Sequence, residues 1–183
     1  MPIGADLPMW HDRGGRGEGE GMMTDWDAIR PREVAVEVPP PVDAELRYIG
    51  RIRTPFATRD DCPRRGSLDG PLCTLLLDDV WVPALAGLSA GMRIEVLYWM
   101  HLARRDLVLQ SPRSDEKVFG TFALRSPVRP NPIATSICVI EQIEGGTIVV
   151  RGLECVDGTP LLDIKPERSG YEPKSLPTRG ELP

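Results

Sequence analysis

Short apolar or alternating runs, separated by turn residues, fill most of the chain between residues 45 and 175. Such runs are typical of β-strands, and the apolar spacing of three and four residues that indicates an amphipathic helix is scarce. One or two helical turns are expected at residues 79–85, despite the proline at position 83. The predicted strands span residues 47–53, 71–77, 92–102, 117–124, 135–143, 147–153 and 161–165.

Two turn signals indicate how the last strands connect. Glu144-Gly145-Gly146 supplies the glycines of a tight hairpin turn, and Asp157-Gly158-Thr159-Pro160 supplies a second turn. Because the strands are short, closing the sheet on itself removes edges that would otherwise be exposed. We therefore predict an all-β fold, a single and mostly antiparallel β-barrel with one short helix.

The two ends of the chain differ from its centre in composition. Residues 1–44 contain a glycine-rich run and three consecutive prolines, so we expect a flexible N-terminal extension. An alternating stretch at residues 34–38 could add an edge strand, or an arm to a neighbouring subunit. Residues 45–173 form the predicted barrel domain, and residues 174–183 are expected to be a flexible tail.

Composition and charge narrow the class of protein. A chain of 183 residues with 41% hydrophobic content can form one core. It has no apolar run near the roughly 20 residues that span a bilayer and no secretory signal, so we expect a soluble, cytoplasmic protein without a membrane partner. Residues 45–175 carry 17 basic and 17 acidic side chains, which places the whole net charge of −5 in the two ends. A basic face on a neutral barrel is therefore possible, although solvated arginines are the default interpretation.

Metal and nucleotide motifs are missing from the sequence. The cysteines at positions 62, 73, 138 and 155 have no Cys-x-x-Cys spacing, and the chain has two histidines, so we expect reduced thiols and no metal site. Cys73 and Cys138 are predicted to be buried in strands. No glycine-rich turn matches a dinucleotide-binding or phosphate-binding motif. A nucleotide cofactor would therefore have to bind in the loops of the barrel.

The most informative segment reads Arg-Ser-Pro-Val-Arg-Pro-Asn-Pro-Ile, at residues 125–133. Its three prolines exclude a helix interior and a central strand, because each one removes a backbone donor and restricts the preceding residue. The segment predicts a rigid polar loop that holds Arg125, Arg129 and Asn131 in a defined geometry. Such a loop suits recognition of a carboxylate, a ribose or a phosphate. The alternative is a surface crossover that the prolines only stiffen.

This loop and a second segment, Asp-Gly-Thr-Pro-Leu-Leu-Asp-Ile-Lys-Pro at residues 157–166, resemble the two main motifs of the TsaA-like family, also called the TrmO or YaeB family. Shorter matches lie at residues 48–55, 62–66, 96–101 and 118–123. Several motifs in the same order seldom agree by chance. The resemblance implies a single β-barrel that pairs into a homodimer, in a short member without the C-terminal domain of longer relatives.

The resemblance also implies a function, an S-adenosylmethionine-dependent methyltransferase that modifies N6-threonylcarbamoyladenosine in tRNA. The cofactor would be S-adenosylmethionine and the partner tRNA. Residues implied to bind substrate are Arg129, Asn131 and Lys165. Residues implied to bind the cofactor are Pro63, Arg64, Arg65, Met100, His101, Arg125, Thr135, Glu154, Cys155, Asp157 and Gly158.

Methyl transfer needs alignment of the reactants and a route for the proton that leaves the acceptor nitrogen. The catalytic candidates are His101, Asp163 and Lys165, with Glu154 as a further titratable group. Each has a structural alternative: a histidine bonded to a carbonyl at the core's end, or exposed residues alternating along a strand. A different class of function also remains open, namely a catalytically silent barrel that binds S-adenosylmethionine or RNA as a sensor or assembly module. A structural dimerisation domain is the third interpretation.

Overall fold

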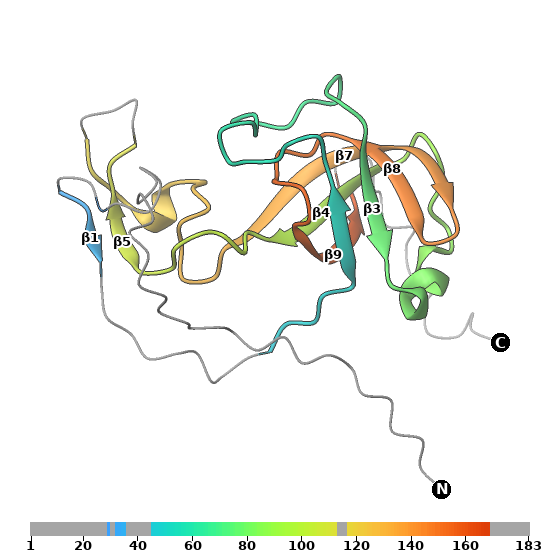
Figure 1. Ribbon diagram of the computed structural model, residues 1–183, viewed down its shortest axis with the longest axis horizontal. Coiled ribbons are helices and arrows are strands. Elements are labelled where there is room, and N and C mark those ends of the chain that lie inside the picture. The colour runs from blue at the N-terminus through green and yellow to red at the C-terminus, as the bar shows by residue number, and fades with distance from the viewer. Residues whose placement is uncertain (1–28, 30–31, 36–44, 113–116, 169–183) are drawn as a thin grey trace, which may run out of the picture.

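Antiparallel strands close into a barrel in the computed structural model, which describes residues 29, 32–35, 45–112 and 117–168. Neighbouring strands follow the order β2–β3–β8–β7–β4–β9 around the barrel (Figure 1). The prediction of an all-β antiparallel barrel is thereby confirmed. The barrel strands are β2 (Gly50–Arg53), β3 (Cys73–Leu77), β4 (Arg93–Trp99), β7 (Ile133–Glu144), β8 (Thr147–Arg151) and β9 (Pro160–Pro166).

The barrel interior is filled by alternate residues of its strands. On β4, the side chains of Ile94, Val96 and Tyr98 are at most 1% exposed, and the residues between them are partly exposed. This period of two is the one expected for a strand with one buried face. The hydroxyl of Tyr98 shares a 2.8 Å hydrogen bond with the hydroxyl of Ser136 on β7, so the one polar atom of this buried ring has a partner.

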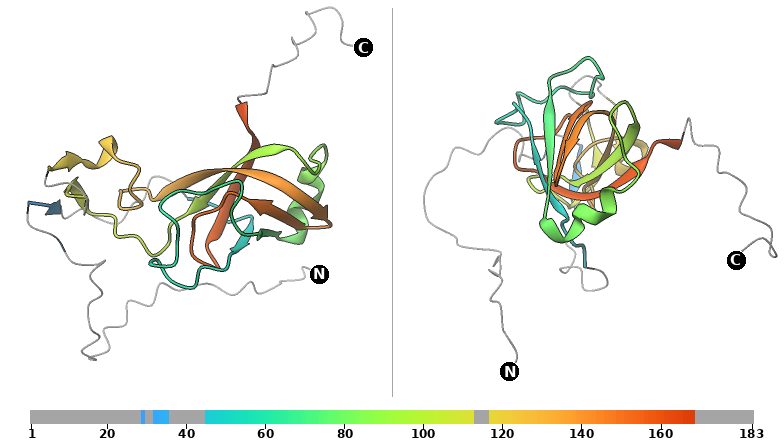
Figure 2. Two further views of the ribbon diagram at one scale, coloured as in Figure 1. Left: turned by 90° about the horizontal axis from the view of Figure 1, so that it is seen from above. Right: turned by 90° about the vertical axis from the view of Figure 1, so that its right-hand side faces the viewer.

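A second, smaller sheet lies beside the barrel, at the left of Figure 1 and in the left view of Figure 2. Its order is β1 (Val34–Ala35), β5 (Leu107–Gln110) and β6 (Phe119–Gly120). β1 belongs to the segment predicted as an N-terminal extension, and it pairs with β5 of its own chain. The rest of that extension, apart from Ile29, Arg32 and Glu33, lies outside the described residues, as does the predicted tail at residues 174–183.

One predicted strand is mostly wrong. Of residues 117–124, only Phe119–Gly120 forms a strand, and a 3₁₀ turn, η2 (Thr121–Ala123), follows. The buried hydroxyl of Thr121 explains the change, because it donates to the carbonyl of Leu107 (2.6 Å) and accepts from Nε2 of Gln110 (2.8 Å). These side-chain bonds hold the chain where a strand would need a neighbouring backbone. β5 was not predicted at all, because four residues between polar turns give too short a pattern.

The remaining predicted elements are present with small shifts at their ends. η1 (Asp79–Leu85) is a 3₁₀ helix and contains Pro83, which confirms the short helix. Gly145 (φ 54°) and Gly158 (φ 80°) adopt the left-handed conformations that favour glycine, as the two predicted turns require. The cysteines are free thiols, and those expected in strands, Cys73 and Cys138, are buried. No helix in the described part of the chain is both long and apolar enough to cross a membrane.

Candidate functional site

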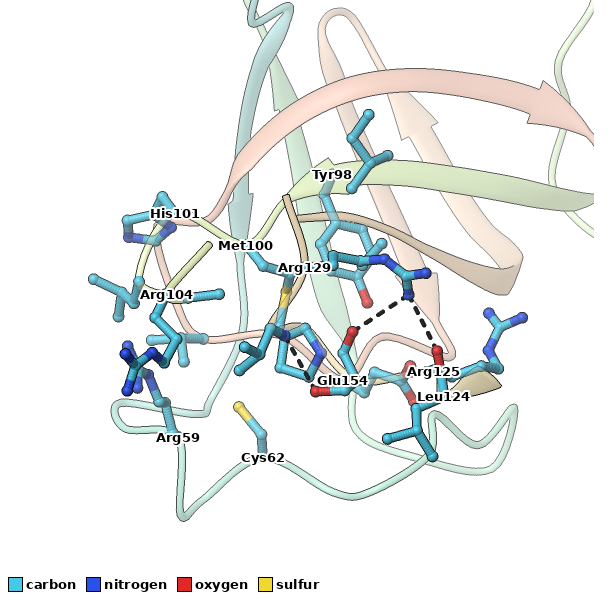
Figure 3. A pocket seen from close by; sticks show the side chains of 18 of the residues that line it. Arg59, Cys62, Tyr98, Met100, His101, Arg104, Leu124, Arg125, Arg129 and Glu154 are labelled. Atoms are coloured by element: carbon cyan, nitrogen blue, oxygen red, sulfur yellow. Dashed lines mark hydrogen bonds between the residues drawn. The ribbon is translucent and has the colours of Figure 1, made fainter. Parts of the chain in front are cut away.

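A cavity of about 690 Å³ lies between one end of the barrel and the small sheet (Figure 3). This volume is typical of sites that hold a small molecule, which range over about 300–1,000 Å³. Its walls come from stretches far apart in the sequence, within residues 59–64, 98–110, 122–129, 133–135 and 154–159, together with Glu33. The fold therefore brings five of the recognised motifs to one place.

The proline-containing loop forms one wall, and Arg129 holds its shape from inside. The Arg129 guanidinium donates to the carbonyls of Leu124 (3.3 Å) and Ser126 (3.4 Å), as Figure 3 shows. A second bond comes from the small sheet, where Nε2 of Gln110 donates to the carbonyl of Val128 (2.7 Å). The sequence predicts a rigid loop from its prolines, and these contacts of Arg129 and Gln110 restrain the loop further.

Arg125 lies on the same loop and presents its charge to the cavity. Its guanidinium donates to the carbonyl of Thr135 at 3.4 Å, and its positive charge acts on the carboxylate of Glu154. Thr135 also lines the cavity, and its hydroxyl donates to Glu95 on β4 (2.8 Å). A guanidinium held beside a cavity in this way can grip a carboxylate or phosphate with two parallel hydrogen bonds.

Glu154 comes from the connection between β8 and β9, and a close backbone approach positions it. The backbone N–H of Gly66 donates to its carboxylate. A Cβ on Gly66 would lie 1.8 Å from the carbonyl oxygen of Gly152, so only glycine allows this approach. Partial burial raises the pKa of Glu154, and the Gly66 hydrogen bond with the charges of Arg125 and Arg65 opposes that rise.

Met100 and His101 form the wall that follows β4. The N–H of Met100 donates to the carbonyl of Pro132 (2.8 Å), which ties this wall to the end of the proline loop. Partial burial lowers the pKa of His101, and the positive charges of Arg51 and Arg59 act in the same direction. The imidazole is therefore neutral near pH 7 and has a nitrogen that can accept a proton.

The cavity wall includes eight of the residues implied by the sequence. These are Pro63, Arg64, Met100, His101, Arg125, Arg129, Thr135 and Glu154.

The other implied residues lie off the cavity wall, where each has a structural contact. Asp157 accepts from the backbone N–H of Thr54 (3.0 Å) and pairs with Arg53 (3.0 Å), so it joins the β8–β9 connection to β2. Gly158 is the left-handed turn residue that follows, and Cys155 is fully buried.

Asp163, Lys165, Asn131 and Arg65 also lie outside the cavity lining. Asp163 and Lys165 form an ion pair with each other on β9, which matches the alternative of an exposed strand face. Asn131 accepts weakly from Arg105 (3.4 Å), whose guanidinium also lies over the ring of Trp99. Arg65 does not line the cavity but lies close enough for its charge to act on Glu154.

Several residues of the cavity have no signal in the sequence that would have singled them out. Glu33 and Gln110 reach it through the small sheet. The exposed ring of Phe122 reaches it from η2 and lies within the match at residues 118–123, but Phe122 was not among the implied binding residues. Arg59 and Arg104 also line it, and neither lies within a recognised motif. Within the described residues, no group of three or more His, Cys, Asp or Glu side chains is arranged to hold a metal ion.

Relatives can be aligned in sequence with most of this chain. A protein of Rhizobium radiobacter named "probable S-adenosyl-L-methionine-binding protein VirR" is 55% identical over 145 residues, which cover 79% of this chain and 83% of that protein. A mouse protein named "tRNA (adenine(37)-N6)-methyltransferase" is 30% identical over 137 residues, 70% of this chain and 32% of the mouse protein.

Solved structures and a family model agree with these relatives. The crystal structure of TrmO from Pseudomonas aeruginosa superposes with a TM-score of 0.57 at 31% identity and covers 78% of this chain. The chain spans 65% of the length of that solved chain. The model of the tRNA-methyltransferase O N-terminal domain matches residues 51–171. The chain therefore belongs to the tRNA-methyltransferase O family, as the order of its motifs predicts.

Proposed function

We propose that this protein binds S-adenosylmethionine in the cavity and transfers its methyl group to an adenine nitrogen of tRNA. One observation carries the proposal: eight residues implied by the family resemblance line one cavity, although they come from four separate parts of the chain. The names of the relatives support both halves of the proposal, cofactor binding and tRNA methylation.

The residues present fit the chemistry of the cofactor. Its carboxylate would pair with Arg125, since this guanidinium is exposed to the cavity and anchored through the carbonyl of Thr135. Its ribose hydroxyls or ammonium group would donate to the carboxylate of Glu154, which Gly66 already orients. Met100 and Leu124 supply apolar wall, which keeps water from the reacting atoms.

The bound cofactor would supply a methyl group on a positively charged sulfur. This sulfur leaves readily, because it becomes a neutral thioether when the methyl group is transferred. The protein must align the acceptor and take up the proton that leaves its nitrogen. His101 is the candidate for that proton, because its lowered pKa leaves it neutral and it faces the cavity. Glu154 is the second candidate, because its raised pKa makes it more basic than an ordinary carboxylate. Asp163 and Lys165 lie off the cavity, so we assign them no part in the reaction.

The acceptor that we propose is N6-threonylcarbamoyladenosine, because the family resemblance implies it and it carries an N–H beside an acidic side group. Arginines at positions 59, 64, 104, 125 and 129 line the cavity and would attract a phosphate backbone and the threonyl carboxylate. We further propose that residues 45–173 act as one domain, that the protein pairs into a homodimer and that it works in the cytoplasm, where tRNA is modified.

A second candidate function has an observation in its favour. Relatives named as S-adenosyl-L-methionine-binding proteins include one that is 55% identical. A barrel that binds the cofactor without methylating tRNA, and acts as a sensor or assembly module, is consistent with that name.

Two measurements separate these functions. Isothermal titration with S-adenosylmethionine should show binding, and Arg125→Ala should weaken it about tenfold or more, the loss expected for a charge-assisted bond. Arg93→Ala is the matched control, since Arg93 pairs with Glu167 on the barrel and does not line the cavity. The second measurement is nucleoside mass spectrometry, on tRNA from cells that lack the modification. A product one methyl heavier supports the enzyme, and binding without that product supports the silent barrel.

A further inference from the structure

Phe122 presents an aromatic ring to solvent at the cavity. The residue is 80% exposed, the highest fraction among the large hydrophobic side chains that the structure describes, and it lines the cavity. Most exposed apolar side chains need no explanation, because folded proteins leave many of them on their surfaces. Phe122 differs because it belongs to the wall of the candidate site. A ring so exposed adds little to the packing of the protein, so its position favours a contact with a ligand.

The backbone that carries this ring is held in place. Thr121, the preceding residue, is 4% exposed, and its hydroxyl donates to the carbonyl of Leu107 (2.6 Å) and accepts from Gln110 (2.8 Å). The N–H of Leu124 donates to the carbonyl of Thr121 (3.2 Å), which closes the 3₁₀ turn η2. The ring therefore projects from a restrained turn, and a ligand that stacks on it does not first have to order a loop.

Cationic side chains line the same cavity. Arg125 follows Phe122 by three residues, and Arg129 lies four residues further along the same loop. Proteins that bind single-stranded RNA use this combination, because an aromatic ring stacks on the flat face of a base and guanidinium groups contact the phosphates. The cavity wall therefore offers both kinds of contact that an unpaired nucleotide can use.

S-adenosylmethionine also contains an adenine, but exposure favours the acceptor as the partner of Phe122. Met100 and Glu154, to which we assign cofactor contacts, are partly buried, whereas Phe122 faces solvent. A macromolecular acceptor enters from solvent, so it meets an exposed ring before it reaches the partly buried wall. The base that stacks must be unpaired, because neighbouring bases cover both faces of a paired base in a helix.

We propose that Phe122 is a substrate-binding residue that stacks on the adenine base of the acceptor nucleotide and fixes the plane in which its nitrogen meets the methyl donor. This inference rests on the proposed function, because it takes an unpaired adenine of tRNA as the acceptor. Its consequence is that the ring acts on the acceptor and leaves the affinity for the cofactor unchanged.

The test compares turnover of tRNA with binding of the cofactor in three variants. Phe122→Ala removes the ring, Phe122→Leu keeps an apolar side chain without a flat face, and Phe122→Trp keeps a stacking surface. With tRNA that lacks the methyl group, kcat/KM should fall about five- to hundredfold in Phe122→Ala and nearly as far in Phe122→Leu, the loss expected for one base stacked on an aromatic ring. Phe122→Trp should stay within about threefold of wild type, because indole also stacks on bases. Isothermal titration should show S-adenosylmethionine affinity within about twofold of wild type in all three. Val80→Ala is the matched control, because Val80 is 73% exposed on η1 and does not line the cavity.

The outcomes separate this inference from the proposed function. Unchanged kcat/KM in Phe122→Ala, or full activity in Phe122→Leu, would overturn the stacking role, while methylation of tRNA by the wild-type protein would leave the proposed function intact. Weaker S-adenosylmethionine binding in Phe122→Ala would place the ring on the cofactor, and a changed molecular mass in light scattering would place it at a subunit contact. Either result would overturn the inference. No methylation of tRNA by the wild-type protein would overturn both. Should Phe122→Ala fail to fold, the comparison of Phe122→Leu with Phe122→Trp decides between apolar contact and stacking.

Discussion

Gly66→Ala is a perturbation whose effect follows directly from the backbone geometry of the site. The new Cβ would lie 1.8 Å from the carbonyl oxygen of Gly152 and 2.8 Å from the carbonyl carbon. Ordinary contacts of a Cβ begin near 3.4 Å, and the neighbour is backbone, so the loop that carries residue 66 must retreat by more than 1 Å. That retreat breaks the hydrogen bond from the Gly66 N–H to the carboxylate of Glu154.

The expected loss follows from the contact that we propose between Glu154 and the cofactor. A hydrogen bond to a charged group contributes about 1.5–3 kcal/mol net, so displacing the Glu154 carboxylate from that contact should weaken S-adenosylmethionine binding by about tenfold or more. Isothermal titration measures the affinity, and differential scanning fluorimetry shows whether the barrel still melts near its wild-type temperature. Gly120→Ala is the control, since no atom lies within 4 Å of its Cβ and its φ is −61°. Wild-type affinity in Gly66→Ala, matching Gly120→Ala, would refute this account of the site.

Two more substitutions test how the site is built. Asp157→Ala removes the acceptor of the Thr54 N–H and the partner of the largely exposed Arg53. Chemical denaturation should therefore show a loss of about 1–2 kcal/mol in stability, and cofactor affinity should stay within about twofold of wild type. Weaker binding without a loss of stability would instead make Asp157 a ligand contact. Glu154→Gln should be more stable than wild type at pH 7 to 8, because the raised pKa means that the charged carboxylate costs stability once the pH exceeds the folded-state pKa. This advantage should shrink as the pH falls towards 4, where Glu154 is protonated in both states, and an advantage independent of pH in thermal melts would contradict it.

The sequence predicts the barrel well because barrel strands carry a signal of their own. β4 alternates buried and more exposed residues over its whole length, and the glycines at positions 145 and 158 mark the turns on either side of β8. The small sheet carries weaker signals, because the stretches at residues 34–38 and 117–124 anticipate only the two-residue strands β1 and β6, and nothing anticipates β5. β1 and β6 have two residues each, and they exist because β5 lies between them and because Thr121 bonds to Leu107. Pairing over such distances in the chain is a tertiary effect that no local pattern contains.

The residues of the candidate site were likewise only partly predictable from the sequence. Arg125 and His101 lie in recognised motifs, Glu154 was implied by the family resemblance just ahead of one, and the structure brings all three to one cavity. Asp157 and Lys165 belong to the same kind of motif but lie off the cavity wall, where Asp157 accepts from the Thr54 N–H and Lys165 pairs with Asp163 on β9. A motif records that residues are needed together, and it does not say whether they are needed for binding or for closing a barrel. Glu33 lies outside every motif, so only the pairing of β1 could reveal it.

The arrangement of the cavity also explains why the small sheet matters for function. The barrel and the connections at one of its ends carry Glu154, Thr135 and His101. The small sheet carries Gln110, and Glu33 directly precedes its strand β1. The side chain of Gln110 donates to both Thr121 and Val128, so it joins the small sheet to the loop that presents Arg125. A shift of that sheet would therefore move the proline loop and the Glu33 carboxylate together relative to Glu154. Because bonds to charged groups depend steeply on distance, the affinity of the site is tied to how the N-terminal strand packs, although that strand lies outside the domain that defines the family.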